Sequence, residues 1–443
     1  MLPTRPEGGV QPLRDISSRY SEKFRDDMSN ETSLQSDKQP AFAALHHRNF
    51  RFFFVGTMLA MLGDNIEHVV SYWLLFQKFH SPALAGFAEI SHWTPFLFLS
   101  VYFGALADRR DCRKVIQAAQ VLFMGVSLVW AVLFYTNTIQ VWHAGLLLIV
   151  HGIAGAMWSP AEQLVIHDIV GTEHLQSAVR LNATSRQLGI LFGPAVGAGL
   201  MLWLGPPLAL VANVVIYLPL TIWLLYVPYT GHFRKGAPPK RSIGWADAIH
   251  VLREVAHNRP IVTMIVLGGS ASLLVGNTFQ TLMPAFAADL GAGQADFTYS
   301  ALLMASAVGA VFGGFLLEGK GWLQPRVRTA IICAIIWCVA ITAFAFSTNY
   351  YLSLVLLFCA GTLNLAFYSS AQTIVQLLAP AELRGRLIGL FSMSALGLRA
   401  FSGVTVGIVG GVIGIHRSLG FSAIALLVVT ASLFVFAVQR QSD

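Results

Sequence analysis

The sequence predicts an all-α membrane protein with twelve transmembrane helices in two pseudo-symmetric bundles of six. Of its 443 residues, 55% are hydrophobic and only 12% are charged, whereas soluble domains carry about 25% charged residues. The hydrophobic residues come in blocks of roughly 20, the length at which a helix crosses a hydrocarbon core of about 30 Å. Basic residues gather between alternate blocks. These three features favour a polytopic membrane protein over a soluble one.

The elements follow from the chain in order. Residues 1–47 are polar and mixed in charge, which predicts a disordered cytoplasmic tail. The residues near Met1 lack the apolar run of a cleavable signal peptide, so we expect none. A first bundle is predicted for residues 48–228, with spans near 52–78, 83–106, 115–136, 141–168, 180–203 and 207–227. A second bundle is predicted for residues 260–443, with spans near 260–287, 297–318, 328–347, 350–378, 385–411 and 417–438.

The connection between the bundles, residues 229–259, is basic and then shows apolar residues at helical spacing. This pattern predicts a cytoplasmic linker with a short amphipathic helix on the membrane surface, although a plain solvated connector fits equally well. In the twelve-span arrangement, nearly all loop cations fall on one side, which the positive-inside rule makes cytoplasmic. We therefore expect a multi-pass protein of the cell inner membrane with both termini in the cytoplasm.

A charged hairpin separates the second and third predicted spans, with the sequence Gly104-Ala-Leu-Ala-Asp-Arg-Arg-Asp-Cys-Arg-Lys114. It resembles the loop signature of the major facilitator superfamily, Gly-x-Leu-Ala-Asp-Arg-x-Gly-Arg-Lys. Gly104 would let two helices approach, and Asp108 would face the positive N-terminal end of a neighbouring helix. The resemblance implies a cytoplasmic gate that also includes Arg109 and Arg113. The alternative is a positively charged cytoplasmic loop that has no role in gating. Asp111 and Cys112 replace the usual glycine and arginine, which predicts a looser latch.

The fifth predicted span contains Gly189-Ile-Leu-Phe-Gly193-Pro194-Ala-Val-Gly197-Ala-Gly199. It resembles the Gly-x-x-x-Gly-Pro-x-x-Gly-Gly antiporter motif of exporters in this superfamily. Small residues permit close helix packing, and a proline removes one backbone hydrogen bond and bends the helix. Gly189, Gly193, Pro194 and Gly197 are therefore candidate packing residues. Ordinary helix packing is the alternative.

Residues 379–386, Ala-Pro-Ala-Glu-Leu-Arg-Gly-Arg, end the tenth span and open the eleventh. They are similar to the Pro-x-Glu-x-Arg-Gly-Arg turn of the drug:proton antiporter branch that includes macrolide efflux proteins and enterobactin exporters. The resemblance adds Glu382, Arg384 and Arg386 to the expected cytoplasmic gate.

Ionisable residues inside the spans are the candidates for chemistry, because a charge in hydrocarbon costs several kcal/mol unless it meets water or a partner. Asp64, Glu67, His68 and Ser71 occur at i, i+3, i+4 and i+7, so one face of the first span is polar and is expected to line a central cavity. His151 is a candidate proton relay because imidazole titrates near physiological pH. For Asp64 and His151 the alternative is a structural hydrogen bond to a neighbouring helix. Glu89 and Arg399 complete the candidate coupling or cavity residues.

These features predict a secondary active transporter that exports a hydrophobic or amphipathic small molecule, drug-like or siderophore-like, by alternating access with protons as coupling ion. Its expected partners are the small-molecule substrate, protons and the lipid bilayer, with no nucleic acid and no partner chain in a monomer. No phosphate-binding Gly-x-x-x-x-Gly-Lys-Ser/Thr loop or metal-ligand spacing is visible, so no enzyme activity, cofactor or metal is expected. A lysolipid or lipid flippase on the same fold, and a non-transporting receptor or scaffold, remain as alternatives.

Overall fold

A computed structural model describes residues 42–79, 82–232, 256, 258–276, 282–290, 295–320, 324–380 and 383–438. Within these ranges every regular element is a helix. Residues 1–41 of the predicted disordered tail and the predicted amphipathic helix of the linker lie outside the described residues. The last part of that predicted tail, residues 42–47, is ordered instead, because it forms a 3-10 turn in which Ala43 and Ala44 are buried.

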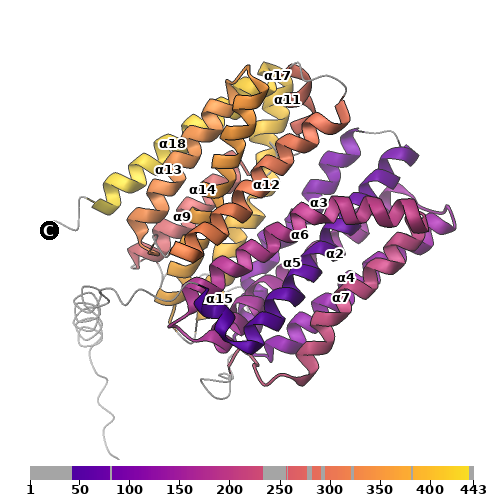
Figure 1. The fold of residues 1–443 in the computed structure, drawn as a ribbon, viewed down its shortest axis with the longest axis horizontal. Coiled ribbons are helices and arrows are strands. Elements are labelled where there is room, and N and C mark those ends of the chain that lie inside the picture. Colours follow the sequence, from indigo (N-terminus) through magenta and orange to yellow (C-terminus); the bar gives the residue numbers. More distant parts are fainter. Residues whose placement is uncertain are drawn as a thin grey trace, which may run out of the picture. The chain divides into compact units, whose positions relative to one another are not determined.

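The six spans predicted for the first half each fall on one helix (Figure 1). After a short 3-10 turn, η1 (Ala43–His46), these helices are α2 (Arg48–Phe79), α3 (Pro82–Ala107), α4 (Cys112–Tyr135), α5 (Val141–Val170), α6 (Leu175–Leu204) and α7 (Pro206–Tyr226). The start of α4 is fixed locally, because the Asp111 side chain accepts a hydrogen bond from the Arg113 backbone N–H at 3.0 Å.

The second half contains α9 (Arg259–Leu274), α11 (Met283–Asp289), α12 (Ala295–Lys320), α13 (Val327–Ala345), α14 (Tyr350–Leu378) and α18 (Ile415–Val438). The predicted span 260–287 is not one helix. Its first part ends at Leu274, and Gly276 has a φ of 52°, a left-handed conformation that glycine adopts readily at helix ends. Expecting a single helix there was wrong.

The predicted span 385–411 is continuous but irregular. It runs through α15 (Arg384–Ser392), α16 (Arg399–Ser402) and α17 (Val409–Ile413), joined by two π-helical turns, η2 (Met393–Gly397) and η3 (Gly403–Ile408). Such turns are rare and often mark functional segments. The length of the apolar segment predicted this span, but nothing in the sequence predicted its two π-helical turns.

Nine described helices are long and apolar enough to cross a membrane, and ten if the bent α6 counts as one span. α2 is outside this group because polar and ionisable side chains interrupt its middle, and α9 because it has only 16 residues. Large apolar side chains such as Leu202 and Val412 are 89% and 82% exposed, as expected for helices that face lipid. The count of twelve spans stays a prediction.

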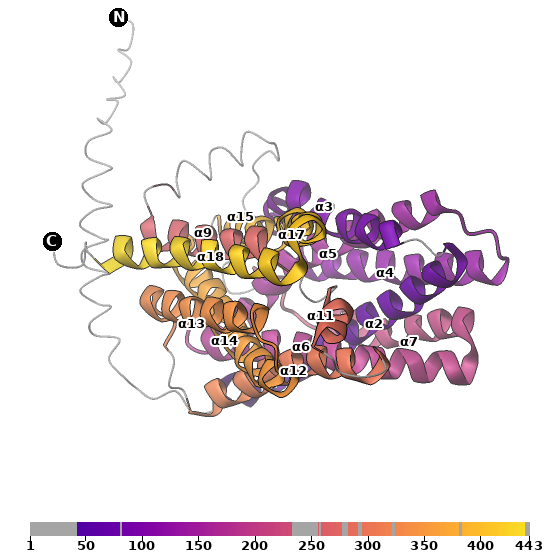
Figure 2. The same cartoon turned by 90° about the horizontal axis from the view of Figure 1, so that it is seen from above.

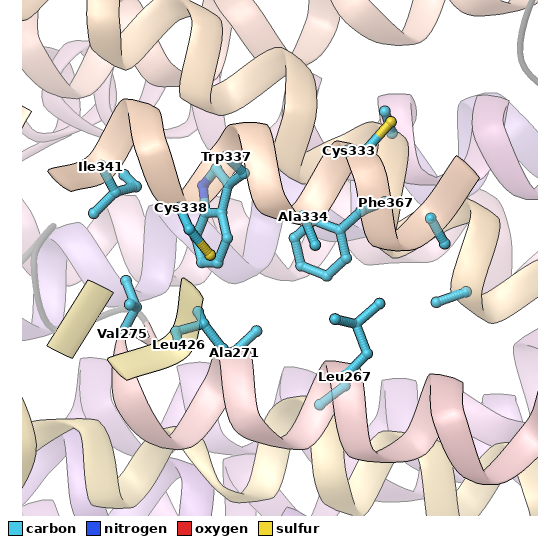
Figure 3. Close-up of a cluster of buried hydrophobic side chains, with 14 of the residues drawn as sticks. Leu267, Ala271, Val275, Cys333, Ala334, Trp337, Cys338, Ile341, Phe367 and Leu426 are labelled. Atoms are coloured by element: carbon cyan, nitrogen blue, oxygen red, sulfur yellow. The ribbon is translucent and has the colours of Figure 1, made fainter. Parts of the chain in front are cut away.

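Most helices of the first half and most of the second half lie on opposite sides in Figure 2. The buried core divides in the same way. Among the described residues, one cluster of buried side chains joins residues 261–426 and takes only Val101 from the first half, whereas another joins residues 44–227 and takes only Ile388 from the second. Figure 3 shows part of the first cluster, where Trp337 and Cys338 of α13 pack near Ala271 of α9. Contacts between the halves are made by α3 with α15 and η2, and by α6 with α12 and α14. The proposed domain boundaries at 48, 228 and 260 stay predictions.

Candidate functional site

The two halves are joined at Asp108, directly after α3. Its Oδ1 accepts a hydrogen bond from the Gly385 backbone N–H at 2.6 Å, and its Oδ2 accepts one from the Arg386 N–H at 2.9 Å. Both donors lie in the first turn of α15, where unpaired N–H groups and the helix dipole favour an anion. We call this contact the Asp108 latch.

The latch holds a carboxyl group away from water, since Asp108 is 4% exposed. Burial raises the pKa of Asp108 from 3.8 to about 7, against the opposing effects of the two backbone hydrogen bonds and of the Arg386 and Arg109 charges. The Arg386 Nε lies 4.0 Å from Oδ2. The Cys112 thiol also interacts electrostatically with this carboxyl group. In this conformation the latch therefore changes charge near neutral pH.

Glycines let the backbones of α3 and the α15–η2 segment touch. A Cβ on Gly104 would lie 2.9 Å from the Gly385 carbonyl carbon, and one on Gly389 would lie 3.1 Å from the Val101 Cα. A Cβ on Gly397 would lie 2.5 Å from the Leu97 Cα. These contacts involve backbone atoms, which yield little, so larger side chains do not fit between the halves here.

Further hydrogen bonds cross between the halves near the latch. Arg384 Nη1 donates to the His167 ring at 3.0 Å, and Gln376 Nε2 donates to Gln163 Oε1 at 2.8 Å. Arg113 instead bonds within its own half, to Asp111 at 2.7 Å. Of the other expected gate residues, Arg109 is half-buried at the same hairpin, and Glu382 lies outside the described residues.

A chain of ionisable side chains crosses the inside of the first half. His151 Nε2 lies 2.7 Å from Asp64 Oδ1, and His151 Nδ1 lies 2.9 Å from Glu67 Oε1. Ser127 donates to Glu67 and accepts from Asn213 Nδ2 at 3.2 Å. Glu67 is 1% exposed, whereas the Asp64 side chain is 18% exposed. The polar face of the first span is thus divided, with Glu67 turned between helices and Asp64 partly open.

Two more histidines adjoin this chain. His68 Nδ1 lies 3.6 Å from Asp64 Oδ2, and His68 Nε2 lies 3.4 Å from His92 Nδ1. One ligand atom from each of His68, His92 and His151 lies within 4.8 Å of the others. Over the described ranges, this is the one group of three or more histidine, cysteine or acidic residues arranged closely enough to hold a metal ion.

The glycine motif of α6 packs against the turn of α2 that carries Asp64. A Cβ on Gly189 would lie 2.6 Å from the Met61 Cβ, and one on Gly197 would lie 3.5 Å from the Ile66 Cα. Gly193 faces Asn65, next to Asp64 in the chain. The side chain of Pro194 lies outside the described part. The motif therefore positions α2 within the first half.

Two arginines lie over tryptophan rings of neighbouring helices. The Arg399 Cζ lies 4.9 Å from the ring centre of Trp93, which joins η2–α16 to α3, and the Arg186 Cζ lies 5.3 Å from that of Trp158. Arg186 also pairs with the buried Glu162. The Glu89 side chain lies in a stretch of α3 outside the description.

A family profile described as "transmembrane secretion effector", of the major facilitator type, matches residues 39–443. The chain belongs to this family. Macrolide efflux protein A of Streptococcus pyogenes is 22% identical over 77% of this chain and 84% of its own length. The staphyloferrin A transporter of Staphylococcus aureus is 20% identical over 86% of this chain and 94% of its own length.

Other similarities agree with this family. The MFS-type transporter YkuC of Bacillus subtilis is 24% identical over 47% of this chain, which spans about half, 49%, of that relative. The human organic anion transporter MFSD10 shares the fold with a TM-score of 0.69 at 14% identity, over 88% of this chain and 99% of that one. The protein is therefore a multi-pass membrane protein with a transporter fold, and family and fold point to a transporter rather than an enzyme.

The sequence did not reveal several residues of this site. Gly385, Gly389 and Gly397 were not candidates, although spacings of four and eight residues put them on one helix face, which is a signal for close packing. His92 had no such signal, because its neighbours His68 and His151 lie on other helices.

Removing one partner of the Glu162–Arg186 pair is expected to destabilise the protein. Glu162 is fully buried and Arg186 is 28% exposed, so Glu162→Ala leaves a desolvated cation beside Trp158. Breaking a buried pair lowers the free energy of unfolding by about 3–5 kcal/mol. Because Arg186 is partly exposed, we expect a loss at the lower end, about 3 kcal/mol. Thermal unfolding in detergent measures the loss. Glu173→Ala, at an exposed position, is the control, and equal melting temperatures for the two variants would contradict the expectation.

Proposed function

We propose that the protein is a secondary active exporter of a hydrophobic or amphipathic small molecule, driven by proton entry and working by alternating access of its two halves. The names of the relatives suggest macrolide-like or siderophore-like cargo. The protein would act as a monomer in the cell inner membrane, with both termini in the cytoplasm.

Alternating access is supported by the way the halves meet. Each half has its own buried core, and within the described part of the chain Val101 and Ile388 are the only buried hydrophobic residues that cross between these clusters. Many of the crossing contacts are polar, including the Asp108 latch, the Gln376–Gln163 hydrogen bond and the Arg180–Glu318 ion pair at 4.0 Å, and glycines allow the close backbone approach. Such contacts separate at a lower cost than a shared apolar core, because water satisfies polar groups that part. In this proposal the Asp108 latch closes the cytoplasmic side.

Proton coupling rests on one observation, the buried chain Asp64–His151–Glu67. Ionisable groups within membrane helices are rare and typically mark ion pathways. A proton bound by Asp64 would neutralise a charge, and the relative stability of the two conformations would change accordingly. Arg399 and Trp93 would line the cargo path, since a guanidinium on an aromatic ring offers both charge and an apolar face.

The test is cargo uptake into everted membrane vesicles that generate an inside-acid pH gradient. Labelled macrolide and labelled staphyloferrin A are the two probes. We expect uptake of one probe to require the gradient, to collapse with a protonophore, and to fall at least about tenfold in Asp64→Asn. Asp289→Asn, which changes an acid that is 58% exposed in the second half, should transport normally.

The outcomes separate the alternatives. Proton-driven uptake that persists in Asp64→Asn would remove that acid from coupling. Transport of lysolipid without any response to the gradient would favour a flippase, and no flux of any probe would favour a receptor or scaffold.

A further inference from the structure

We propose that His68, His92 and His151, the histidine cluster, bind one divalent first-row transition-metal ion, with Zn²⁺ as the reference ion. The three side chains come from α2, α3 and α5, and their ligand atoms lie within 4.8 Å of one another. The inference rests on the geometry, packing and charge of these side chains. It goes beyond the proposed export function and does not depend on it.

The spacing of one pair of nitrogens, on His68 and His92, suits a tetrahedral ion. Zn–N bonds of about 2.0–2.1 Å put two ligands on a tetrahedral ion roughly 3.4 Å apart. His68 Nε2 and His92 Nδ1 are 3.4 Å apart. The third nitrogen, His151 Nε2, lies 2.7 Å from Asp64 Oδ1, and an ion at the centre of the cluster would replace the hydrogen that joins those two atoms.

A carboxylate already holds the outer nitrogen of His151, and a second carboxylate lies close to the outer nitrogen of His68. Glu67 contacts His151 Nδ1 at 2.9 Å, and Asp64 Oδ2 lies 3.6 Å from His68 Nδ1. Glu67 is itself fixed by Ser127. Histidine ligands usually donate their second N–H to a carboxylate, which fixes the ring and raises the basicity of the ligand nitrogen. The cluster thus has both the inner ligands and the outer support of a metal site.

Ring packing and charge favour the same occupant. The Phe123 ring lies 4.6 Å from the His151 ring, and the Trp93 ring lies 4.6 Å from the His92 ring, so both imidazoles are restrained. Asp64 and Glu67 provide negative charge to offset a divalent cation. Three imidazoles select zinc, cobalt, nickel or copper over magnesium and calcium, which prefer oxygen ligands. Asp64 and His68 are 18% and 19% exposed, which leaves a fourth position for water or an Asp64 oxygen.

The test measures metal binding to the full chain, purified in detergent with a tag free of histidine and stripped with a chelator. Titration calorimetry with Zn²⁺ should give one ion per chain, and Co²⁺ should give the visible absorption of a tetrahedral complex that Zn²⁺ removes. His92→Ala should lower the Zn²⁺ affinity at least about tenfold. Glu67→Gln keeps all three ligands but loses the carboxylate behind His151, and should lower the affinity about 10–100-fold.

His416→Ala is the matched control, because His416 also sits beside a carboxylate, 3.3 Å from Asp289, but on the other half of the chain. It should bind Zn²⁺ like the wild type. Variants are compared only if they elute as one species and melt near the wild-type temperature without metal, and His68→Ala replaces any that does not. A wild type that does not bind micromolar Zn²⁺, or affinity unchanged in His92→Ala and His68→Ala, would overturn the proposal. Export of macrolide or siderophore is a separate measurement, so either proposal can fail alone.

Discussion

Asp108→Asn is expected to weaken closure of the cytoplasmic side and to lower export at least about tenfold. The carboxylate accepts hydrogen bonds from two backbone N–H groups, through one oxygen each. A carboxyl group has an acceptor on both oxygens even when it is protonated, whereas asparagine replaces one oxygen by an amide N–H group that would face the second donor. Hydrogen bonds to charged groups contribute about 1.5–3 kcal/mol, which is roughly 10–100-fold in a conformational equilibrium. Cargo affinity should change little, because the latch lies away from Arg399 and Asp64.

The same residue is expected to make closure depend on pH. Burial raises the pKa of Asp108 to about 7 in the latched state, and an open latch would return it to an ordinary value near 3.9. The latched state therefore binds the proton more tightly. Its population relative to the open state should be constant above about pH 8 and should rise by up to tenfold per unit as the pH falls from 7 towards 4. Asp108→Asn should abolish this dependence.

Spin labels at the exposed positions 110 and 326 would report the distance between the halves. Cys359 must first be replaced, because it is an exposed free cysteine, whereas the other three cysteines are buried. Asp111→Asn is the control, since Asp111 bonds to Arg113 in its own half. Identical distances and transport in Asp108→Asn and wild type would show that the latch does not control closure. Weakened cargo binding with normal closure would make Asp108 a cargo ligand instead.

Gly389→Leu is expected to keep the two halves apart on the cytoplasmic side and to reduce export to background. A Cβ at this position already meets the Val101 Cα at 3.1 Å, and a leucine adds three further carbons against the backbone of α3. The helices must separate to accommodate them, so the Asp108 latch cannot form. The same spin-label pair should report a long distance at every pH.

Gly411→Leu is the matched control, because a Cβ there has no neighbour within 4 Å. It should close and transport normally. Normal export by Gly389→Leu would mean that α3 and α15 do not need this close approach during transport. A protein that no longer accumulates would be replaced by Gly389→Ala, which should give a smaller shift in the same direction.

Helix positions could be predicted from the sequence because they depend on local features. The predicted span 350–378 matches α14, whose start is fixed by Asn349, which accepts from the Leu352 N–H at 3.0 Å. The predicted span 141–168 differs from α5 by two residues at one end. Apolar length and capping residues are read along a single segment, so the sequence alone determines them. Motifs likewise located the hairpin of Asp108.

Only the tertiary structure decided which side chains meet. Asp64 and His151 are 87 positions apart in sequence, and His68 and His92 are 24 apart, yet they form one cluster. The sequence also did not predict three other features, which are the inward orientation of Glu67, the helix break at Gly276 and the contact of Gly389 with α3. Each depends on how a helix is rotated and how closely it packs on another. Many side chains share that packing, so no single segment encodes it, and the candidate metal site emerges only when three helices come together.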